Sequence, residues 1–311
     1  MPSSLKRRLA LAGLTRPRVD RLMSPLHRLH RLLYGVDVQQ VRRLQDQLRE
    51  QQLALLAATN AQLRTELRGR FLPEPGAYPT GDCVYVLATG PSLSKITDEE
   101  KHVIGQSLSV GMNRYLLFWE KFGIWPDFFF LGDKYVAAPS IFIEACNVIV
   151  GDERPITLLV DQFFRSAAPV TRPAIFFDRW HSDTDEATWA QGPGDKLFFW
   201  RGSLTCLVNL LCVLRVAPKI KLVGVDLNRP GSYFAKETQA RPDLEDPQNL
   251  EAARLGIHST AMPGVRGEAG IEAKWPYVQH SAKQQGVEIV CCNPESLLVQ
   301  AGVCPYEPII A

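Results

Sequence analysis

The stretch Val84-Tyr85-Val86-Leu87-Ala88-Thr89-Gly90-Pro91-Ser92-Leu93 decides the fold of this chain. Five apolar residues are followed directly by a small polar residue, a glycine and a proline. A continuous apolar run, without polar residues in alternation, is typical of a strand covered on both faces. A glycine after such a strand lets backbone N–H groups approach a phosphate or a ribose. We therefore predict a buried strand that opens into a ligand-binding turn.

Six further apolar runs follow, and helical patterns lie between several of them, notably over Ser203–Val216 and Ile271–Gln285. This alternation is typical of an α/β domain with a mostly parallel sheet. We predict a Rossmann-like sheet with helices on both faces and an N-terminal helical extension. The seven predicted strands are Val84–Ala88, Leu108–Met112, Asp127–Leu131, Ile156–Val160, Ala174–Phe177, Ile220–Val225 and Val287–Cys291.

Small polar residues follow all seven runs. Each alone is explained as a turn or cap residue, because Asn and Asp favour such positions. In open α/β sheets, however, ligands bind outside the carboxyl ends of the strands. Several polar residues there favour a polar ligand. They are Thr89, Asn113, Asp133, Asp161, Asp178, Asp226 and Asn293.

The charge of the chain is unevenly distributed. Residues 1–70 hold 14 Lys and Arg against 5 Asp and Glu, which gives +9, whereas the other 241 of the 311 residues carry −7. The motifs of NAD-binding and P-loop proteins are absent, as are nucleic-acid-binding modules. No run of eighteen apolar residues, no secretory signal and no CxxC pair among the 7 cysteines occurs. We expect a cytoplasmic protein that uses neither disulfides nor a zinc ribbon.

The first 82 residues are predicted to lie outside the α/β domain. We expect a basic helical arm over 1–72, a linker over 73–82 and the α/β domain over 83–311, with a lid at 235–270. Residues 1–36 could bind an anionic membrane surface, and the protein would then be peripheral at the inner membrane. The alternative is an arm that is solvated or packs on a partner. The apolar stripe over 37–70 suits a coiled coil that joins copies of the chain, or packing on the main domain.

Three side chains are candidates for chemistry on the residues alone. Among six histidines, His258 lies in a polar loop within the expected lid, and a histidine can act as a general base near neutral pH. Arg201 precedes a helix, where it can bind a carboxylate or a phosphate, or remain a surface arginine. Ser203 is explained equally by an N-cap and by a ligand contact. Thr97 and Glu100 form a capping box that predicts a helix over 98–104.

Seven segments, in the same order, resemble the bacterial CMP-sialic-acid-dependent sialyltransferases of glycosyltransferase family 42. The resemblance spans residues 84–300 and leaves the first 80 residues unexplained. The segments are Val84–Leu93, Val110–Asn113, Phe129–Asp133, Trp200–Ser203, Leu222–Asp226 with Gly231–Tyr233, Ile257–Ser259 and Val290–Leu298.

The resemblance implies an inverting transfer of sialic acid, or of a related keto-sugar acid, from a CMP donor to a surface glycan. The residues visible in the sequence require no metal, and no cofactor is expected beyond the CMP-sugar donor. His258 would be the base, and Tyr233 and Arg201 would neutralise charge that develops on the phosphate or the carboxylate. The residues expected to hold the CMP-sugar are Thr89, Gly90, Ser92, Asn113, Asp133, Ser203, Asp226, Asn228 and Asn293.

Three positions depart from the family pattern. Thr89 and Asp133 stand where the family has asparagine, and Asn228 stands where the first of two phosphate-facing tyrosines falls. Only Tyr233 is left for that role, so the donor or the stabilisation of the leaving group would differ.

Two other functions stay open at this point. Domains of this type occur in flagellin-modifying motility factors and in pterin diphosphokinase-like proteins, and this alternative would need a divalent metal held by Asp133 and Asp226. The other is a scaffold that binds nucleotide without turnover and forms oligomers through 37–70. The Asp183–Asp185 pair matches the DxD pattern of metal-dependent glycosyltransferases, but it does not follow a strand and is interpreted as surface acids.

Overall fold

The computed structural model describes residues 47–48, 50–51, 54, 78–132, 138–164, 168, 172–180, 186–228, 231–241, 256, 258–262 and 269–310. The chain divides into two compact units, residues 1–52 and 53–311. The described residues within 37–70 are all helical, which confirms the predicted helix at those positions. The basic arm over 1–36, Asp133 and the Asp183–Asp185 pair lie outside the described residues. No described helix has the length and apolar character needed to cross a bilayer.

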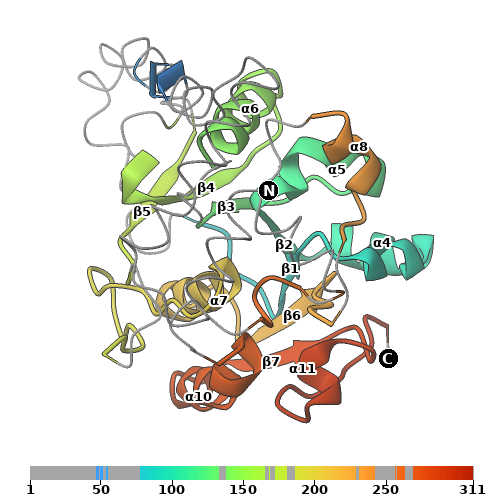
Figure 1. Ribbon diagram of the computed structural model, residues 1–311, viewed down its shortest axis with the longest axis vertical. Coiled ribbons are helices and arrows are strands. Elements are labelled where there is room, and N and C mark those ends of the chain that lie inside the picture. Colours follow the sequence, from blue (N-terminus) through green and yellow to red (C-terminus); the bar gives the residue numbers. More distant parts are fainter. Residues whose placement is uncertain are drawn as a thin grey trace, which may run out of the picture. The chain divides into compact units, whose positions relative to one another are not determined.

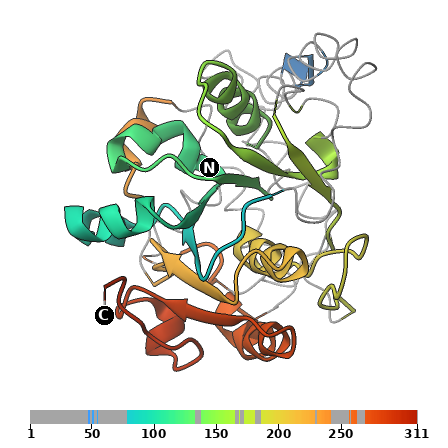
Figure 2. The same cartoon turned by 180° about the vertical axis from the view of Figure 1, so that it is seen from behind.

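Seven parallel strands form one sheet, and each corresponds to one of the predicted apolar runs (Figure 1). The order across the sheet is β5-β4-β3-β2-β1-β6-β7, which Figure 2 shows from β5 in lime to β7 in red. Every strand pair is parallel. The strands are β1 (Val84–Leu87), β2 (Leu108–Met112), β3 (Phe128–Leu131), β4 (Thr157–Asp161), β5 (Ala174–Phe177), β6 (Lys219–Val223) and β7 (Glu288–Cys291).

The direction in which the sheet grows reverses at β1. From β1 the chain builds outward through β2, β3 and β4 to β5, and it then returns through helix α7 (Ser203–Leu214) to β6, on the other side of β1. Val84 pairs with Leu108 on one side and with Ile220 on the other. In doubly wound sheets, ligands bind outside the carboxyl ends of the strands at this switch point. The loops after β1 and β6 are therefore the expected location of a ligand-binding site.

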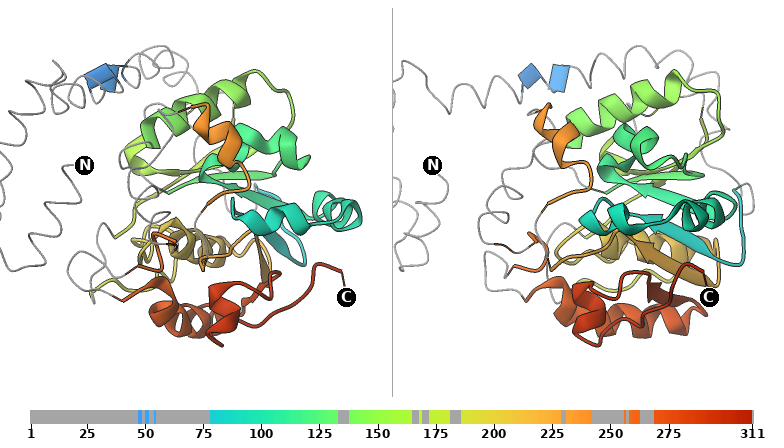
Figure 3. Two further views of the ribbon diagram at one scale, coloured as in Figure 1. Left: turned by 45° about the vertical axis from the view of Figure 1, so that its right-hand side comes forward. Right: turned by 90° about the vertical axis from the view of Figure 1, so that its right-hand side faces the viewer.

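Helices cover both faces of the sheet, as predicted. Alternate residues of a strand point to opposite faces, and the core is divided accordingly. Val84 and Val86 pack in one cluster with α7 and α10 (Ile271–Gln284), whereas Tyr85 and Leu87 pack in another with α4 (Asp98–Gly105) and α5 (Trp119–Phe122). Figure 3 shows α6 (Ala138–Val150, light green) and α7 (gold) on opposite sides of the strands. The remaining short helices are η1 (Pro91–Lys95), η2 (Asn113–Phe118), η3 (Gln162–Phe164), α8 (Ala235–Gln239) and α11 (Leu297–Gln300).

The predicted capping box begins α4. The Thr97 hydroxyl accepts the Glu100 N–H at 3.2 Å, and the Glu100 carboxylate accepts the Thr97 N–H at 2.8 Å. The helix ends at Gly105, one residue later than predicted. None of the seven cysteines, all of which lie among the described residues, forms a disulfide bond in the structure.

Asn209 ties the segment before α7 to that helix. The side chain is fully buried. Its Oδ1 accepts the N–H groups of Ala190 at 3.0 Å and Phe198 at 2.8 Å, and its Nδ2 donates to the Ala190 carbonyl at 3.1 Å. One amide thus satisfies three buried backbone groups, and it fixes the chain that leads from β5 to the start of α7.

Replacing Asn209 with alanine is expected to lower the free energy of unfolding by about 3 kcal/mol, because three buried backbone groups lose their partner. Urea unfolding followed by circular dichroism measures the change. The matched control is Asn147→Ala on α6, where the side chain is exposed and the change should stay within about 0.5 kcal/mol. A similar effect of the two substitutions would contradict this role of Asn209.

Candidate functional site

The carboxylate of Asp226 joins the loops that follow β1, β6 and β7. Its Oδ2 accepts the Ser92 N–H at 2.8 Å, and its Oδ1 accepts an N–H of the Asn293 side chain. All three residues are buried. Three of the predicted site residues therefore meet at the switch point. Both oxygens of the carboxylate are already bound to N–H donors.

Gly90 allows these loops to approach each other. Its N–H donates to the Gly224 carbonyl at 2.8 Å. A Cβ atom at position 90 would lie 2.4 Å from both Asp226 Oδ2 and the Gly224 oxygen. The sequence pattern suggested that this glycine makes room for a phosphate, whereas the structure shows that it makes room for Asp226.

Asn228 and Asn293 fasten the loop after β7. The Asn228 N–H donates to the Asp226 carbonyl at 2.8 Å, and the Asn228 side chain donates to the Glu295 carbonyl at 2.5 Å. The Glu295 N–H donates to Asn293 Oδ1 at 3.0 Å. Leu227, between Asp226 and Asn228, has a left-handed backbone with φ 64°. Asn228, Asp226 and Asn293 therefore direct much of their hydrogen bonding at protein groups.

Two polar atoms at the strand ends have no such partner. Ser92 Oγ and Asn113 Oδ1 are buried and make no hydrogen bond with the residues that the structure describes. Asn113 follows β2 and has φ 54°, a left-handed conformation that asparagine tolerates better than most residues. Buried polar atoms are nearly always hydrogen-bonded, so an unpartnered one calls for a water molecule or a ligand.

His258 is held by Thr260. Its Nδ1 lies 2.8 Å from Thr260 Oγ1 and also accepts the Thr260 N–H at 3.3 Å. Burial lowers the pKa of His258, and the negative charge of Asp226 opposes that shift. The imidazole therefore lies within electrostatic range of the switch point.

Arg201 stabilises the segment that carries His258. Its Nη2 donates to the carbonyls of Ser259 at 3.3 Å and Met262 at 2.7 Å. The next residue, Gly202, packs against the same segment, because a Cβ there would lie 2.7 Å from Thr260 Cγ2. Arg201 also has a left-handed backbone, with φ 58°. The guanidinium was predicted to meet a phosphate or a carboxylate, and these contacts direct it to backbone carbonyls.

Tyr233 contributes its backbone to the site and its ring to α5. The Tyr233 N–H donates to the Thr89 carbonyl at 2.9 Å, which fixes the loop after β1. The phenol donates to the Lys121 carbonyl at 3.4 Å, and the ring packs edge-on against Phe122, with 6.1 Å between the ring centres. The expected contact with a phosphate stays a prediction.

Ser203 and Arg179 extend the same edge of the sheet toward β5. Ser203 begins α7 and lies against Gly132, which follows β3: a Cβ on Gly132 would lie 3.4 Å from the Ser203 Cβ. Arg179 is fully buried and binds Asp161, the last residue of β4. The strand-end pattern indicates Asp161 but not Arg179, because an arginine two residues after a strand carries no local signal of burial.

Asp226, one of the two proposed metal ligands, belongs to no metal-binding cluster among the described residues. No group of three or more His, Cys, Asp and Glu side chains suited to a metal occurs in the described part of the chain. Both oxygens of Asp226 face N–H donors, which is an unsuitable arrangement for a cation ligand. Asp133 lies outside the described residues, so its predicted role stays untested.

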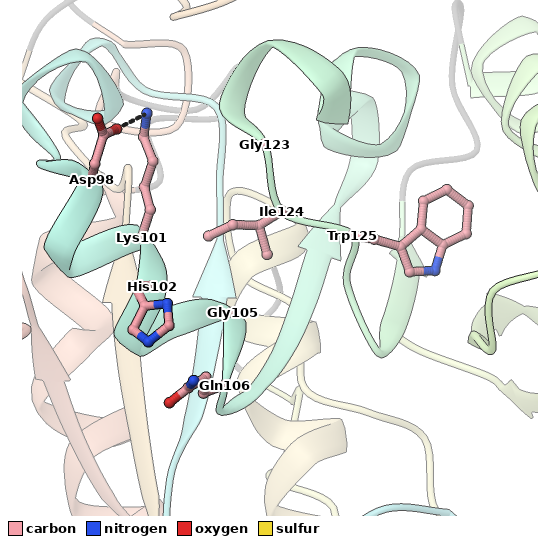
Figure 4. A pocket seen from close by; sticks show the side chains of 8 residues that line it. All are labelled: Asp98, Lys101, His102, Gly105, Gln106, Gly123, Ile124 and Trp125. Carbon is pink, nitrogen blue, oxygen red and sulfur yellow. Dashed lines mark hydrogen bonds and ion pairs between the residues drawn. The ribbon is translucent and has the colours of Figure 1, made fainter.

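A pocket of about 510 Å³ lies at the opposite edge of the sheet (Figure 4). It is bounded by α4 and by residues 123–125, which precede β3. The Lys101 ammonium and the Asp98 carboxylate on its rim form an ion pair at 3.3 Å. The polar strand ends described above lie at the carboxyl edge, so the pocket is separate from them.

Comparison with known proteins identifies no family. No family model and no curated protein matches the chain. Among solved structures, the chain is similar to a MAf glycosyltransferase from Magnetospirillum magneticum AMB-1, with a TM-score of 0.41 and 16% sequence identity over 71% of this chain. The chain spans 33% of the length of that structure. The resemblance to family 42 therefore stays a prediction.

Gly90→Ala is expected to lower the free energy of unfolding by about 1–3 kcal/mol, because the new methyl group must displace Asp226 and Gly224. The urea midpoint measures the change. Gly105→Ala is the control, because no atom lies within 4 Å of the Cβ position there, and helix propensity favours alanine. An unchanged midpoint for Gly90→Ala would contradict the close approach.

The burial of His258 predicts a pH dependence of stability. Because its pKa in the folded protein is lower than in the unfolded chain, the unfolded state binds the proton first as the pH falls below about 6.5. The unfolding free energy of the wild type should then decrease relative to His258→Gln, by up to about 1.4 kcal/mol per pH unit, until the pH reaches the folded pKa. Urea unfolding between pH 5 and 7.5 tests this, with His102→Gln on the exposed face of α4 as the control. Parallel pH profiles for the wild type and His258→Gln would refute it.

Proposed function

We propose that the described α/β unit is the catalytic domain of an inverting glycosyltransferase that moves a sugar acid from a CMP donor to a glycan acceptor. One observation carries the proposal. Ser92 Oγ and Asn113 Oδ1 are buried polar atoms without a partner among the described residues, and they lie beside the switch point of a parallel sheet. Open α/β sheets bind nucleotides at this location.

Ser92 and Asn113 supply chemistry that suits a nucleoside. A serine hydroxyl both donates and accepts, and an amide oxygen accepts. Ribose hydroxyls and the cytosine amino group offer the matching donors and acceptors. The surrounding network of Asp226 and Asn293 would hold the loops in place, so that the nucleoside meets a preorganised edge.

His258 is the proposed general base. For this role the imidazole must carry its proton on Nδ1 and donate it to Thr260 Oγ1, 2.8 Å away, which means that Nδ1 gives up the 3.3 Å hydrogen bond that it otherwise accepts from the Thr260 N–H. Nε2 is then free to accept a proton. The lowered pKa favours the neutral imidazole at neutral pH, which is the form a base requires.

The transfer proceeds in one displacement. The oxygen of the acceptor hydroxyl attacks the anomeric carbon of the sugar acid, while His258 Nε2 takes the hydroxyl proton. The bond between the anomeric carbon and the phosphate oxygen breaks, and CMP leaves with the electron pair. Attack opposite to the leaving group inverts the configuration.

Arg201 and Tyr233 receive modified roles in this proposal. Through the carbonyls of Ser259 and Met262, Arg201 would position the segment that carries His258. Tyr233 would fix the loop after β1 through its backbone. The basic arm over 1–36 would keep the domain at an anionic membrane surface, near lipid-linked acceptors. The metal-dependent alternative has little support at Asp226, which is occupied by N–H donors.

Nucleotide binding is tested by thermal unfolding of the full chain with CMP, UMP, GMP or AMP, each with and without Mg²⁺. CMP is expected to raise the midpoint most, because a ligand that binds only the folded state stabilises it. Ser92→Ala and Asn113→Ala should reduce the shift. The matched control is Ser94→Ala, an exposed serine on η1. A stronger response to another nucleotide, or no response at all, would contradict the CMP donor.

Catalysis is tested by CMP release from CMP-activated sugar acids in the presence of glycan acceptors. His258→Gln is expected to slow release by roughly 10²–10⁴-fold, while the CMP-induced thermal shift is retained. His280→Gln, at an exposed position on α10, should leave the rate unchanged. CMP binding without any transfer in the wild type would favour the non-catalytic scaffold, and equal rates for both variants would exclude His258 as the base.

A further inference from the structure

Arg179 is an arginine buried next to the carboxyl edge of the sheet. It follows β5, and its side chain has no exposed surface. Its Nε donates to Asp161 Oδ2 at 3.0 Å, and the guanidinium lies 4.1 Å above the centre of the Phe199 ring. Asp161 Oδ1 accepts the Phe163 N–H at 2.9 Å. Asp161 and Phe199 together fix the plane and the direction of the guanidinium.

The two terminal nitrogens of this guanidinium have no hydrogen-bond partner among the described residues. Both nitrogens, Nη1 and Nη2, are buried. A buried charged donor without a partner has a large free-energy cost. Two adjacent Nη groups form the planar fork that binds carboxylates and phosphates through paired hydrogen bonds. The fixed orientation and the free fork together are what an oxyanion site needs.

The first turn of α7 lies in the same region. Arg179 forms a parallel bridge with Leu197, shortly before α7. Burial raises the pKa of the thiol of Cys206, the fourth residue of α7, and the charge of Arg179 opposes that shift. The N-cap of α7, Gly202, makes no side-chain cap. The helix N-terminus therefore adds a positive potential near Arg179.

The charged groups near Arg179 are the carboxylates of Asp161 and Asp178 and the ammonium of Lys196. Asp161 bonds the Nε of Arg179. Asp178 Oδ1 accepts the Arg179 backbone N–H at 2.8 Å, and its Oδ2 lies 3.8 Å from Lys196 Nζ. No described acidic group occupies the Nη1 and Nη2 edge, so an incoming anion would not meet a carboxylate already bound there.

We propose that the Nη1 and Nη2 groups of Arg179, next to the first turn of α7, bind an oxyanion of the substrate, either a carboxylate or a phosphate. This inference deepens the proposed function and rests on it for the identity of the substrate. In that reaction the sugar acid supplies a carboxylate and the CMP donor supplies a phosphate. Arg201 was expected to neutralise the charge of the substrate, but its Nη2 donates to the backbone carbonyls of Ser259 and Met262. Arg179 would neutralise that charge instead.

The alternative is an ion pair that serves only the fold. A buried pair of this kind can be replaced by a neutral pair of similar size without loss of folding. The double variant Arg179→Gln with Asp161→Asn keeps polar groups on both sides and removes the cationic fork. Arg179→Lys keeps the charge and removes the paired geometry. Circular dichroism establishes that each variant is folded.

The test measures thermal unfolding of the full chain in sodium phosphate and in sodium acetate, against sodium chloride at equal ionic strength. At an anion concentration of about ten times the dissociation constant, the wild-type unfolding temperature should be about 2–4 °C higher than in sodium chloride. The double variant should lose this rise, and Arg179→Lys should reduce it. General salting effects of phosphate act on every variant alike. The control is the half-exposed surface pair, Arg154→Gln with Asp152→Asn, which should keep the rise.

Each outcome decides the proposal. A rise with phosphate alone or with acetate alone supports it and identifies which group of the substrate binds. An equal rise in the double variant overturns it, and so does a wild type that responds to neither anion beyond chloride. If no sugar transfer is found but the rise depends on Arg179, the oxyanion site stands and the proposed function fails. If sugar transfer is found and the rise does not depend on Arg179, the proposed function stands and the oxyanion site fails.

Discussion

The carboxylate of Asp226 accepts hydrogen bonds from the loop after β1 and from the loop after β7, while its own backbone continues β6. Three neighbouring strands thus share one buried charge at their carboxyl ends. A carboxylate removed from water must be hydrogen-bonded to persist, and here both of its oxygens are. Gly90 and Asn228 are explained by the same constraint, because one makes room for Asp226 and the other bonds to its carbonyl. The shape of the candidate site follows from this arrangement.

The strands were predictable because burial on both faces leaves a direct trace in sequence, namely a continuous apolar run. All seven runs became strands, within one or two residues at each end. The helices predicted over 98–104, 203–216 and 271–285 were also confirmed, whereas α6 was not predicted. The strand order was not predicted. Pairing between β1 and β6 joins residues more than a hundred positions apart, and their local sequences carry no information about the partner.

The site was predictable in its location and less so in its contacts. Polar residues at strand ends identified Asn113, Asp226 and Asn293, because the rule depends only on where strands stop, whereas Ser92 came from the resemblance to family 42. The directions of Arg201 and Tyr233 depend on segments far away in sequence, so a local pattern could not reveal them. Arg179 was missed for a related reason. Its burial results from the packing of β4, β5 and the segment before α7 around it, and no spacing in the sequence records that packing.

The position of β1 inside the sheet has a consequence for how the chain is made. β1 is among the first strands to be synthesised, yet its pairing with β6 requires residues up to Val223. About 130 residues must be translated in between, which takes on the order of 10 s at typical elongation rates. During that interval one edge of an apolar strand has no partner, and exposed edges are templates for aggregation. The nascent chain should therefore depend on chaperones until β6 emerges from the ribosome.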